Sequence, residues 1–397
     1  MDKELELDVN DENIEIINEG LVEIQVPVFD KVSSKAPVFY NSKMELNRDI
    51  SILALQTFQE GIDKEINICD VFGGSGVRAL RYKKEIMGVG EVAVNDISSL
   101  AIEYTLANAI TNELDIEIHQ KEANIMLREH RGEFDVVDID PFGTPSYFVD
   151  SGGYSLKKDS LLCITATDTS ALCGTYKEPC IRKYNANPYK SEYCHENGIR
   201  ILAGFVALTL AKYKKYIEIK LSHSSEHYMR LYIKVNKGSA STDKSLDENI
   251  GHIAHCKKCL YRQSFKGLAT SIPELCPICE GKLAIAGPLW IGKIQNHDFI
   301  AKMIENCEEK IKHLNTEKKA LKLLNSCLEE ANAPITFYDI HVICRNLKIS
   351  APKLANVLDN LEKEGFIAIK THFNPIGIKT DAGIEKVKSI VKSSMDS

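Results

Sequence analysis

The sequence predicts an α/β protein with a mostly parallel, Rossmann-like sheet that ends in an antiparallel hairpin, followed by a four-cysteine ribbon and a winged-helix-like C-terminal domain. Three observations lead to this fold class. From Ile66 to about residue 166, short apolar runs alternate with amphipathic stretches, which is typical of successive βαβ units. Two strand-like runs, 217–223 and 228–235, are separated by a few polar residues. Two C-x2-C pairs lie further along the chain.

Length and composition bound the domain organisation. The chain has 397 residues, more than the usual size of one domain. Of these residues 44% are hydrophobic and 26% charged, a composition that excludes global disorder. We expect a first domain over 1–237, with an acidic segment at 1–30. A ribbon and linker over 238–295 and a helical, winged-helix-like domain over 296–397 should follow. GSASTDKS, residues 238–245, is typical of a flexible linker.

The acidity of the chain is an N-terminal feature. The net charge is −7; residues 1–30 hold ten Asp or Glu and one Lys, so the rest of the chain carries a slight positive charge. A signal peptide would be basic and then apolar at this place, and no run of about 18 apolar residues occurs. We therefore expect a cytoplasmic monomer without a membrane partner. In that compartment the twelve cysteines should not form a disulfide framework.

The predicted sheet is laid out by apolar runs and the helices between them. Strands are expected at 66–72, 91–96, 115–120, 134–140 and 160–167. Helices are expected near 77–87, 98–112, 124–130, around 144, and at 198–213. A parallel sheet that ends in an antiparallel hairpin is unusual for dinucleotide-binding dehydrogenases and is the arrangement of class I methyltransferases.

The first strand-to-helix turn predicts a cofactor site. Asp70 closes the strand, and Gly74 and Gly76 permit a tight turn and close approach of a ligand to the backbone. With Ala79 these glycines also satisfy G-x-G-x-x-A, so a nicotinamide cofactor is an alternative at this point. Asp96 ends the next strand, where it could accept hydrogen bonds from ribose hydroxyls of either NAD or S-adenosylmethionine.

Two further acidic positions have competing interpretations. Glu122 follows the third strand, where methyltransferases commonly contact the adenine amino group, yet it is equally suited to cap a helix. The fourth strand delivers Asp138 and then Asp140-Pro141-Phe142, which resembles the N/D-P-P-Y/F motif of methyltransferases that modify exocyclic amines of nucleobases. An ordinary Asp-Pro turn is the alternative.

The chemistry of an exocyclic amine explains the parts of that motif. The nitrogen donates its lone pair into the ring, so it is a poor nucleophile until acceptors on its N–H groups draw it toward tetrahedral geometry. The Asp140 carboxylate and the Pro141 carbonyl could be those acceptors. Phe142 would stack on a base turned out of its helix, and Asp138 shares the strand face of Asp140.

Four cysteines have the spacing of a structural metal site. Cys256, Cys259, Cys276 and Cys279 form two C-x2-C pairs sixteen residues apart, within the spacing of four-cysteine zinc sites. Iron in a rubredoxin-like site is the alternative. With all four positions filled by thiolate, no coordination site stays open, so the predicted zinc should be structural.

Several motifs together resemble the tRNA (guanine-26-N2)-dimethyltransferase family. They lie at residues 38–55, 70–82, 94–98, 138–145, 164–186 and 287–294. The resemblance implies an enzyme of tRNA processing that binds tRNA and S-adenosylmethionine and transfers one or two methyl groups to N2 of guanine 26.

The same resemblance assigns roles to individual residues. It implies that Arg48, Arg78, Asp96, Glu122 and Ala123 bind the methyl donor, although Glu122 stands where the family more often has Asp. It also implies that Asp140 is the catalytic carboxylate. Phe39 and Phe142 would be the aromatic faces that hold guanine.

The last hundred residues predict a charged amphipathic helix at 298–323 and then a winged helix. Its helices are expected at 338–347 and 351–364 and its wing at 366–379, with a turn near Asn374-Pro375. Residues 296–397 contain fifteen Lys or Arg and fourteen Asp or Glu, so this domain lacks a strong electrostatic footprint for nucleic acid. A tRNA-positioning role is the hypothesis here.

Two other classes of function stay open from the sequence. An amino-methyltransferase acting on DNA or ribosomal RNA would share the sheet and the D-P-F-G edge. A zinc and winged-helix regulator without catalysis is the alternative that is not an enzyme.

Overall fold

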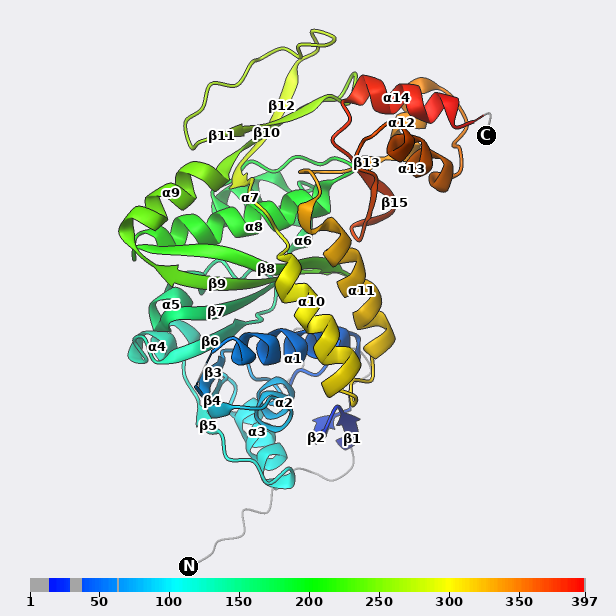
Figure 1. The fold of residues 1–397 in the computed structure, drawn as a ribbon. Coiled ribbons are helices and arrows are strands. Elements are labelled where there is room, and N and C mark those ends of the chain that lie inside the picture. Colours follow the sequence, from blue (N-terminus) through cyan, green and yellow to red (C-terminus); the bar gives the residue numbers. More distant parts are fainter. Residues whose placement is uncertain (1–13, 29–37, 63, 396–397) are drawn as a thin grey trace, which may run out of the picture. The chain divides into compact units, whose positions relative to one another are not determined.

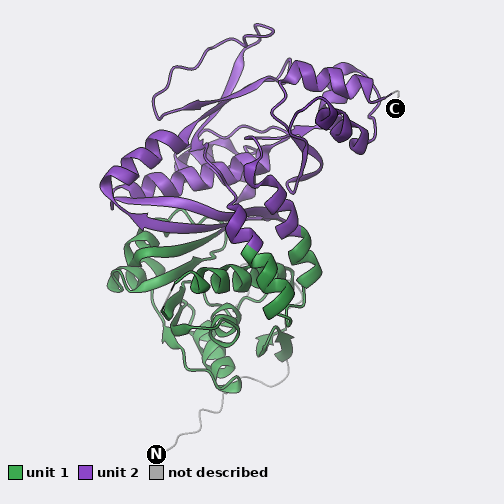
Figure 2. Cartoon of the chain, in the orientation of Figure 1, with its two compact units in different colours: residues 1–164, 302–322 green, residues 165–301, 323–397 purple. Residues whose placement is uncertain are grey.

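The computed structural model describes residues 14–28, 38–62 and 64–395, and the chain divides into two compact units (Figure 2). Unit 1 comprises residues 1–164 and 302–322, and unit 2 comprises residues 165–301 and 323–397. Part of the expected acidic segment, residues 1–13 and 29–30, lies outside the described residues. Its described part forms an antiparallel pair, β1 (Ile14–Glu19) and β2 (Val22–Pro27).

Unit 1 contains the predicted parallel strands, apart from the last two residues of β7, which belong to unit 2. They are β3 (Ile66–Asp70), β4 (Val89–Asn95), β5 (Glu117–His119), β6 (Phe134–Ile139) and β7 (Leu156–Ala166). β3 pairs in parallel with β4 on one side and β6 on the other, and β6 pairs in parallel with β7. All residues of β6 are buried, as expected for a parallel sheet that helices cover on both faces.

The helices of unit 1 precede or connect these strands, and two of them have a side-chain N-cap. They are α1 (Glu45–Glu60), α2 (Val77–Glu85), α3 (Ser99–Thr111), α4 (Ala123–Glu129) and α5 (Val149–Ser155). Ser98 caps α3 by accepting the backbone N–H of Ala101. The helix expected around residue 144 begins only at Val149, because Pro141, Gly143 at φ +82° and Pro145 interrupt the chain before it. Figure 1 shows α1 to α3 on one side of the parallel strands and α4 and α5 on the other.

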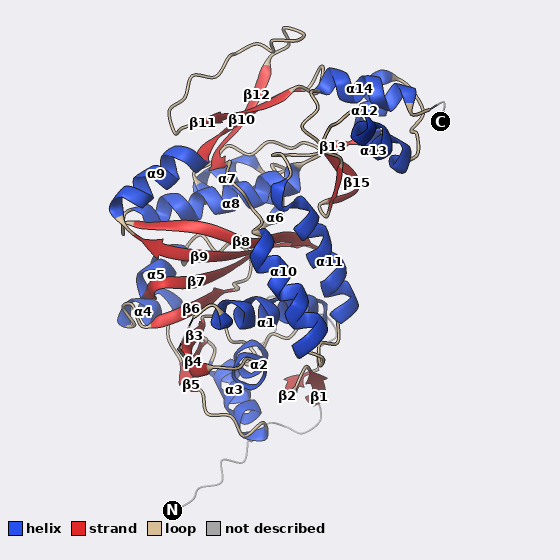
Figure 3. Ribbon diagram, viewed as in Figure 1, coloured by secondary structure: helices blue, strands red, loops and turns tan. Residues whose placement is uncertain are grey.

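Unit 2 begins with helices and the predicted hairpin. Its first elements are α6 (Thr169–Leu172), α7 (Lys177–Tyr184), α8 (Cys194–Ala211), β8 (Lys215–Ser225) and β9 (Tyr228–Lys237). β8 and β9 pair antiparallel, with Ile217 opposite Val235. The strand order of the sheet is β5-β4-β3-β6-β7-β9-β8 (Figure 3). This order confirms the predicted Rossmann-like sheet with a terminal antiparallel hairpin.

The predicted flexible linker at 238–245 is wrong, because the chain there forms α9 (Ser239–Asn249). Gly238 precedes the helix, and the Thr242 hydroxyl donates to its carbonyl at 2.7 Å. Thr242 is buried, so the helix is anchored by packing as well as by this bond. Small hydroxyl residues are typical of linkers but are also favoured at helix starts, and composition alone does not separate the two.

Beyond α9 lie the ribbon and the winged-helix elements. β10 (Ile250–Cys256) pairs with both β11 (Arg262–Lys266) and β12 (Leu283–Trp290). The C-terminal elements are β13 (Tyr338–Asp339), α12 (Ile340–Leu347), α13 (Leu354–Lys363), β14 (Ile369–Thr371), β15 (Asn374–Lys379) and α14 (Ile384–Ser393). The two predicted helices and the wing are present in the predicted order. The wing turns at 372–373 rather than near Asn374-Pro375, since both of those residues lie in β15.

The predicted helix at 298–323 is wrong as a single element. The chain forms α10 (His297–Glu305), a π-helical turn at 306–310 and then α11 (Glu317–Glu329). Side chains explain the break within unit 1: Asn306 donates to Thr57 Oγ1 at 3.1 Å, and the Thr316 hydroxyl donates to Asp49 Oδ2 at 2.6 Å. Among the described helices, none combines the length and the apolar character needed to span a bilayer.

Candidate functional site

The carboxyl ends of the strands in unit 1 bring most of the predicted site residues to one edge. Asp70 ends β3, and β3 lies between β4, which leads to Asp96, and β6, which contains Asp138 and leads to Asp140. Asp70 and Asp138 are register partners on the paired strands. Ligands of open α/β sheets bind outside this edge, so the placement agrees with the site that the sequence predicts.

Arg78, in the first turn of α2, joins two of these carboxylates. Its Nη2 donates to Asp140 Oδ2, and its Nη1 lies 3.5 Å from Asp138 Oδ2. The hydroxyl of Tyr82, one turn further along the helix, donates to the same Asp138 oxygen at 2.5 Å. Asp138 is fully buried, whereas the Asp140 side chain keeps 17% of its surface exposed. Asp140 is therefore the carboxylate that an incoming group could reach.

Two residues of α1 also accept hydrogen bonds from the guanidinium of Arg78. Asn47 Oδ1 accepts from Nη2 at 2.9 Å, and Ser51 Oγ accepts from Nη1 at 3.1 Å. The sequence analysis did not identify Asn47, Ser51 or Tyr82. The spacing of Arg78 and Tyr82 at i and i+4 places them on one helix face, which is the one local signal that could have suggested a shared role.

Asp70 is a buried acid whose negative charge is compensated by few neighbouring groups. It is fully buried, and within the described chain its carboxylate oxygens meet no hydrogen-bond donor at good geometry. Burial raises the pKa of Asp70 to about 7; Asp138 and Asp140 add to the rise, and Arg78 opposes it. The N–H of Phe72 also lowers this pKa, but it does not offset the burial, and a buried carboxylate with so few donors is costly.

The glycine turn holds its backbone close to neighbouring groups. Gly74 has φ +56°, and its N–H donates to Asp96 Oδ2 at 2.9 Å. A Cβ at Gly74 would lie 2.9 Å from the backbone oxygen of Phe39, so no side chain fits there without a shift of the backbone. Gly76 has φ +80° and precedes α2. Both glycines are required by conformation, as the sequence predicts.

Glu122 makes the capping contact that the sequence analysis weighed as its alternative, and Asp96 makes a local turn contact. Asp96 Oδ1 accepts the N–H of Ser98 at 3.0 Å. Glu122 is the N-cap of α4 and accepts the N–H of Ile125 at 3.0 Å. Ala123 is the first residue of this helix, where backbone N–H groups have no partner within the helix. Both acids are partly exposed and have lone pairs left for a ligand.

The two aromatic residues meet each other directly. Phe39 and Phe142 pack edge to face, with ring centroids 4.6 Å apart. Phe142 is 55% exposed, whereas Pro141 before it is buried. A flat base does not fit between rings in this arrangement; it would lie on the exposed face of Phe142 or separate the pair.

Arg48 is engaged elsewhere in unit 1. Its guanidinium forms two contacts of 2.5 Å with the carboxylate of Glu19. Arg81 joins the same carboxylate at 2.8 Å and Asp49 at 2.7 Å. Burial alone would raise the pKa of Glu19, but Arg48 and Arg81 outweigh it and hold that pKa low. The structure thus brings Arg78, but not Arg48, into contact with the carboxylates at the edge.

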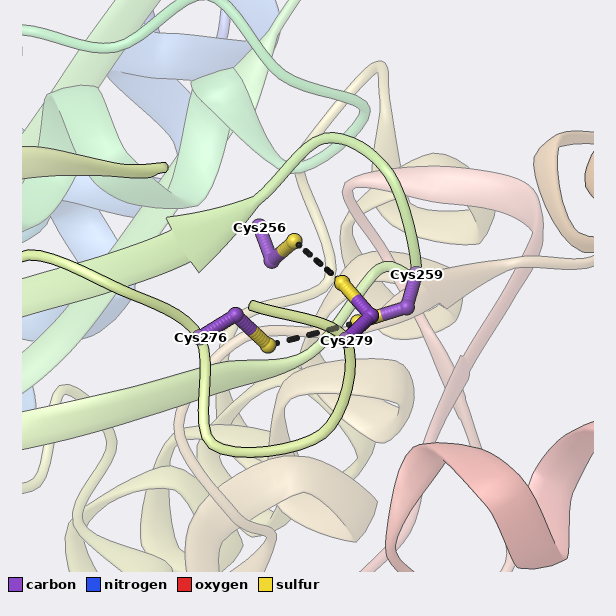
Figure 4. Close-up of side chains that lie close together, drawn as sticks. All are labelled: Cys256, Cys259, Cys276 and Cys279. Carbon is purple, nitrogen blue, oxygen red and sulfur yellow. Dashed lines mark hydrogen bonds between the residues drawn. The ribbon is translucent and has the colours of Figure 1, made fainter. Parts of the chain in front are cut away.

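The four predicted metal-binding cysteines converge in unit 2 (Figure 4). Their sulfur atoms all lie within 4.8 Å of one another, with Cys256 and Cys279 at 3.4 Å and Cys259 and Cys276 at 3.5 Å. Zn–S bonds of about 2.3 Å at tetrahedral angles separate sulfurs by about 3.8 Å. The donor set therefore fits a tetrahedral ion with thiolate ligands.

The two cysteine pairs have the same backbone geometry. In each, the residue after the second cysteine has positive φ, Leu260 at +67° and Glu280 at +56°. The N–H of Leu260 donates to the Cys256 carbonyl and that of Glu280 to the Cys276 carbonyl. The N–H of Gly281 lowers the pKa of the Cys279 thiol to about 7. The repeated turn points the thiols of both pairs at a common centre.

Comparisons with known proteins show the family to which the chain belongs. A model of the family "N2,N2-dimethylguanosine tRNA methyltransferase" matches residues 19–392. Over 381 residues, 96% of this chain and 97% of the relative, the chain is 67% identical to a tRNA (guanine(26)-N(2))-dimethyltransferase of Methanobrevibacter smithii. The enzyme of the same name from Methanothermobacter thermautotrophicus is 51% identical, over 96% of this chain and 99% of that protein.

A solved structure is similar over nearly the whole chain. It is Trm1 from Pyrococcus horikoshii in complex with S-adenosyl-L-methionine, with a TM-score of 0.85 and 32% sequence identity. The match covers 95% of this chain and 99% of that one.

Proposed function

Because the chain belongs to the N2,N2-dimethylguanosine tRNA methyltransferase family, we propose that the sheet edge around Asp140 is the place where guanine accepts the methyl group. The enzyme transfers one or two methyl groups from S-adenosylmethionine to the exocyclic N2 of guanine 26 in tRNA. The contact between Arg78 and Asp140, beside the exposed ring of Phe142, carries the assignment of the site.

The residues of unit 1 fit the methyl donor. The buried Asp70 carboxylate, which lacks good donors within the described chain, suits the ammonium group of the methionine part. The backbone at Gly74 and Gly76 leaves room for close approach of the donor. Asp96 suits the ribose hydroxyls of the donor. Glu122 and the N–H of Ala123 suit the edge of its adenine. The bound donor supplies an electrophilic methyl carbon on a sulfonium. We assign Arg48 and Arg78 to positioning roles, since protein carboxylates already occupy both guanidinium groups.

The chain's own groups can activate the amine. Arg78 fixes Asp140 through its Oδ2, and Asn47 Oδ1 accepts a bond from the same arginine nitrogen. In this proposal the other oxygen of Asp140, Oδ1, and the carbonyl of Pro141 accept the two N–H bonds of guanine N2. These contacts hold the amine lone pair toward the methyl carbon, and Asp140 takes the proton that the amine releases. Asp138 supports Asp140 through their shared arginine.

We propose zinc for the four-cysteine site, with a structural role. Thiolate donors in a tetrahedral set favour zinc over hard cations. Methyl transfer needs no Lewis acid in this scheme, since the sulfonium already carries a good leaving group. We also propose that residues 238–295 and 296–397 position tRNA beside a catalytic domain over 1–237, with the winged-helix elements against the tRNA backbone.

Replacing Asp140 by Ala tests the proposed site. We expect methyl transfer to fall at least about 100-fold, because a general base is lost, while calorimetry shows the affinity for S-adenosylmethionine within about twofold of wild type. The exposed Asp115 gives the matched control, Asp115→Ala, which should keep full activity.

Two results would contradict the proposal. Retained transfer by Asp140→Ala would remove this residue from catalysis. Undiminished methylation of a tRNA transcript whose guanine 26 is replaced by adenine would place the modified base elsewhere.

A further inference from the structure

Unit 2 contains a second cluster of metal-ligand side chains. Cys173, Cys194 and His195 place one ligand atom each within 4.8 Å of the others. None of them belongs to the ribbon or to the sheet edge that holds Asp140. We propose that this cluster is a second zinc site, with two thiolates and one imidazole as ligands.

The distances inside the cluster suit a shared ion. Cys173 Sγ lies 3.8 Å from His195 Nδ1, and Ser224 Oγ lies 3.2 Å from the same nitrogen. Zn–S bonds of about 2.3 Å and Zn–N bonds of about 2.0–2.1 Å separate tetrahedral ligands by roughly 3.5–3.8 Å. The Ser224 hydroxyl or a water completes the set, since zinc sites with three protein ligands keep a fourth position for such an oxygen.

The backbone fixes the positions of these ligands. Cys173 is the C-cap residue directly after α6, and Cys194 and His195 are the first two residues of α8, which packs on α6. Gly174, directly after Cys173, has φ +81°, and a Cβ there would lie 2.9 Å from the backbone nitrogen of Lys190. Only glycine lets the turn after α6 lie against the chain that enters α8. The thiol of Cys173 is thus held next to Cys194 by main-chain geometry.

The type of donor decides the type of ion. Sulfur and imidazole nitrogen are ligands of zinc and other borderline or soft cations, whereas magnesium and calcium require oxygen. Two thiolates and a neutral imidazole balance the charge of a divalent ion. Cys173 is buried, and Cys194 and His195 are partly exposed, so an ion can enter from solvent without unfolding of the helices.

The wild-type protein itself provides the first test. Full-length enzyme purified with zinc in the medium should contain two zinc ions per chain by mass spectrometry of the metal. X-ray absorption at the zinc edge should give an average shell of three sulfurs and one nitrogen or oxygen. A ribbon site alone would give one ion and a shell of sulfur only, and that result would overturn the proposal.

Variants separate the new site from the ribbon. The double variant Cys194→Ser, His195→Asn should lose one zinc ion per chain. The coordination shell of the zinc that stays bound should then consist of sulfur alone. Cys180→Ser changes a buried cysteine of α7 that lies outside the cluster, and should keep both ions. An unchanged zinc content in the double variant would refute the site. So would a Cys173–Cys194 disulfide in metal-replete wild-type protein, detected as two thiols that resist alkylation until reduced.

Discussion

At the scale of single residues, the site is a cluster of acids arranged around one arginine. Asp70, Asp138 and Asp140 all interact with Arg78. One guanidinium does not neutralise the three carboxylates, so the cluster keeps a proton on one of its members near neutral pH. Asp70 is that member, since burial raises its pKa to about 7.

This charge balance predicts the pH dependence of donor binding. The ammonium group of the methyl donor needs the ionised form of Asp70, so binding must displace the proton. We expect the affinity for S-adenosylmethionine to rise close to tenfold per pH unit below about pH 7 and to level off above it. Calorimetric titrations between about pH 5.5 and 7.5 measure this slope.

The Asp70→Asn variant is the control for this prediction. Asparagine cannot titrate, so its affinity should be weak and nearly independent of pH. The sign for stability is opposite: the folded protein keeps a proton that the unfolded chain releases above its normal pKa of 3.8. Asp70 therefore makes the unliganded protein less stable as the pH rises from about 4 to 7. A steep slope that persists in the variant would contradict the role of Asp70.

Individual residues also show how far the sequence could predict the site. The glycine turn and the D-P-F sequence are local patterns, and Gly74, Gly76, Asp140 and Phe142 lie where these patterns place them. Contacts that join distant segments could not be derived this way. Arg78 and Asp140 are 62 positions apart in the sequence, and no periodicity encodes their meeting.

At the scale of elements, prediction succeeded where hydrophobic periodicity was strong. The buried strands β3, β6 and β7 and the hairpin of β8 and β9 were all predicted. Prediction failed where polar side chains determine where a helix forms or is interrupted. Thr242 helps anchor a helix in a segment with linker composition, and Asn306 and Thr316 interrupt a helix whose apolar pattern continues.

The ribbon allows a prediction for one element. Cys279→Ser removes one thiolate of the proposed zinc site, and we expect the loss of one zinc ion per chain and a melting temperature lower by several degrees. The reason is that binding free energy in structural zinc sites is folding free energy. Metal analysis and calorimetric scans measure both effects.

Ile278, in the same cysteine turn, provides the matched control. Its side chain is 45% exposed, so Ile278→Ser should keep the zinc and change the melting temperature little. Full retention of zinc by Cys279→Ser would show that this cysteine is not a ligand.

At the scale of the whole molecule, unit 2 joins segments that are far apart in the chain. Residues 165–301 and 323–397 form one compact unit. A buried ionic network lies within it: Lys379 of β15 contacts Glu196 of α8 at 2.7 Å and Glu330 at 3.8 Å. Glu196 also pairs with Arg200 at 2.8 Å. The C-terminal elements are therefore part of the core that includes α8, and we expect that they cannot be removed without cost.

Lys379→Met tests this coupling. Burial alone would raise the pKa of Glu196, but Lys379 and Arg200 outweigh it and lower that pKa to about 2. Methionine keeps most of the side-chain volume but leaves Glu196 and Glu330 undercompensated, so the free energy of unfolding should fall by about 3–5 kcal/mol.

The pH dependence supplies an independent readout of the same variant. Glu196 contributes stability that is present above its normal pKa of 4.5 and is lost as the pH falls toward about 2. Lys379→Met should therefore shift acid unfolding to higher pH. Lys370→Met, at an exposed position of β14, should change the free energy of unfolding by less than about 0.5 kcal/mol. Urea titrations at neutral and acidic pH measure the free energy of unfolding of both variants. If Lys379→Met is as stable as Lys370→Met, the C-terminal segment is an independent module.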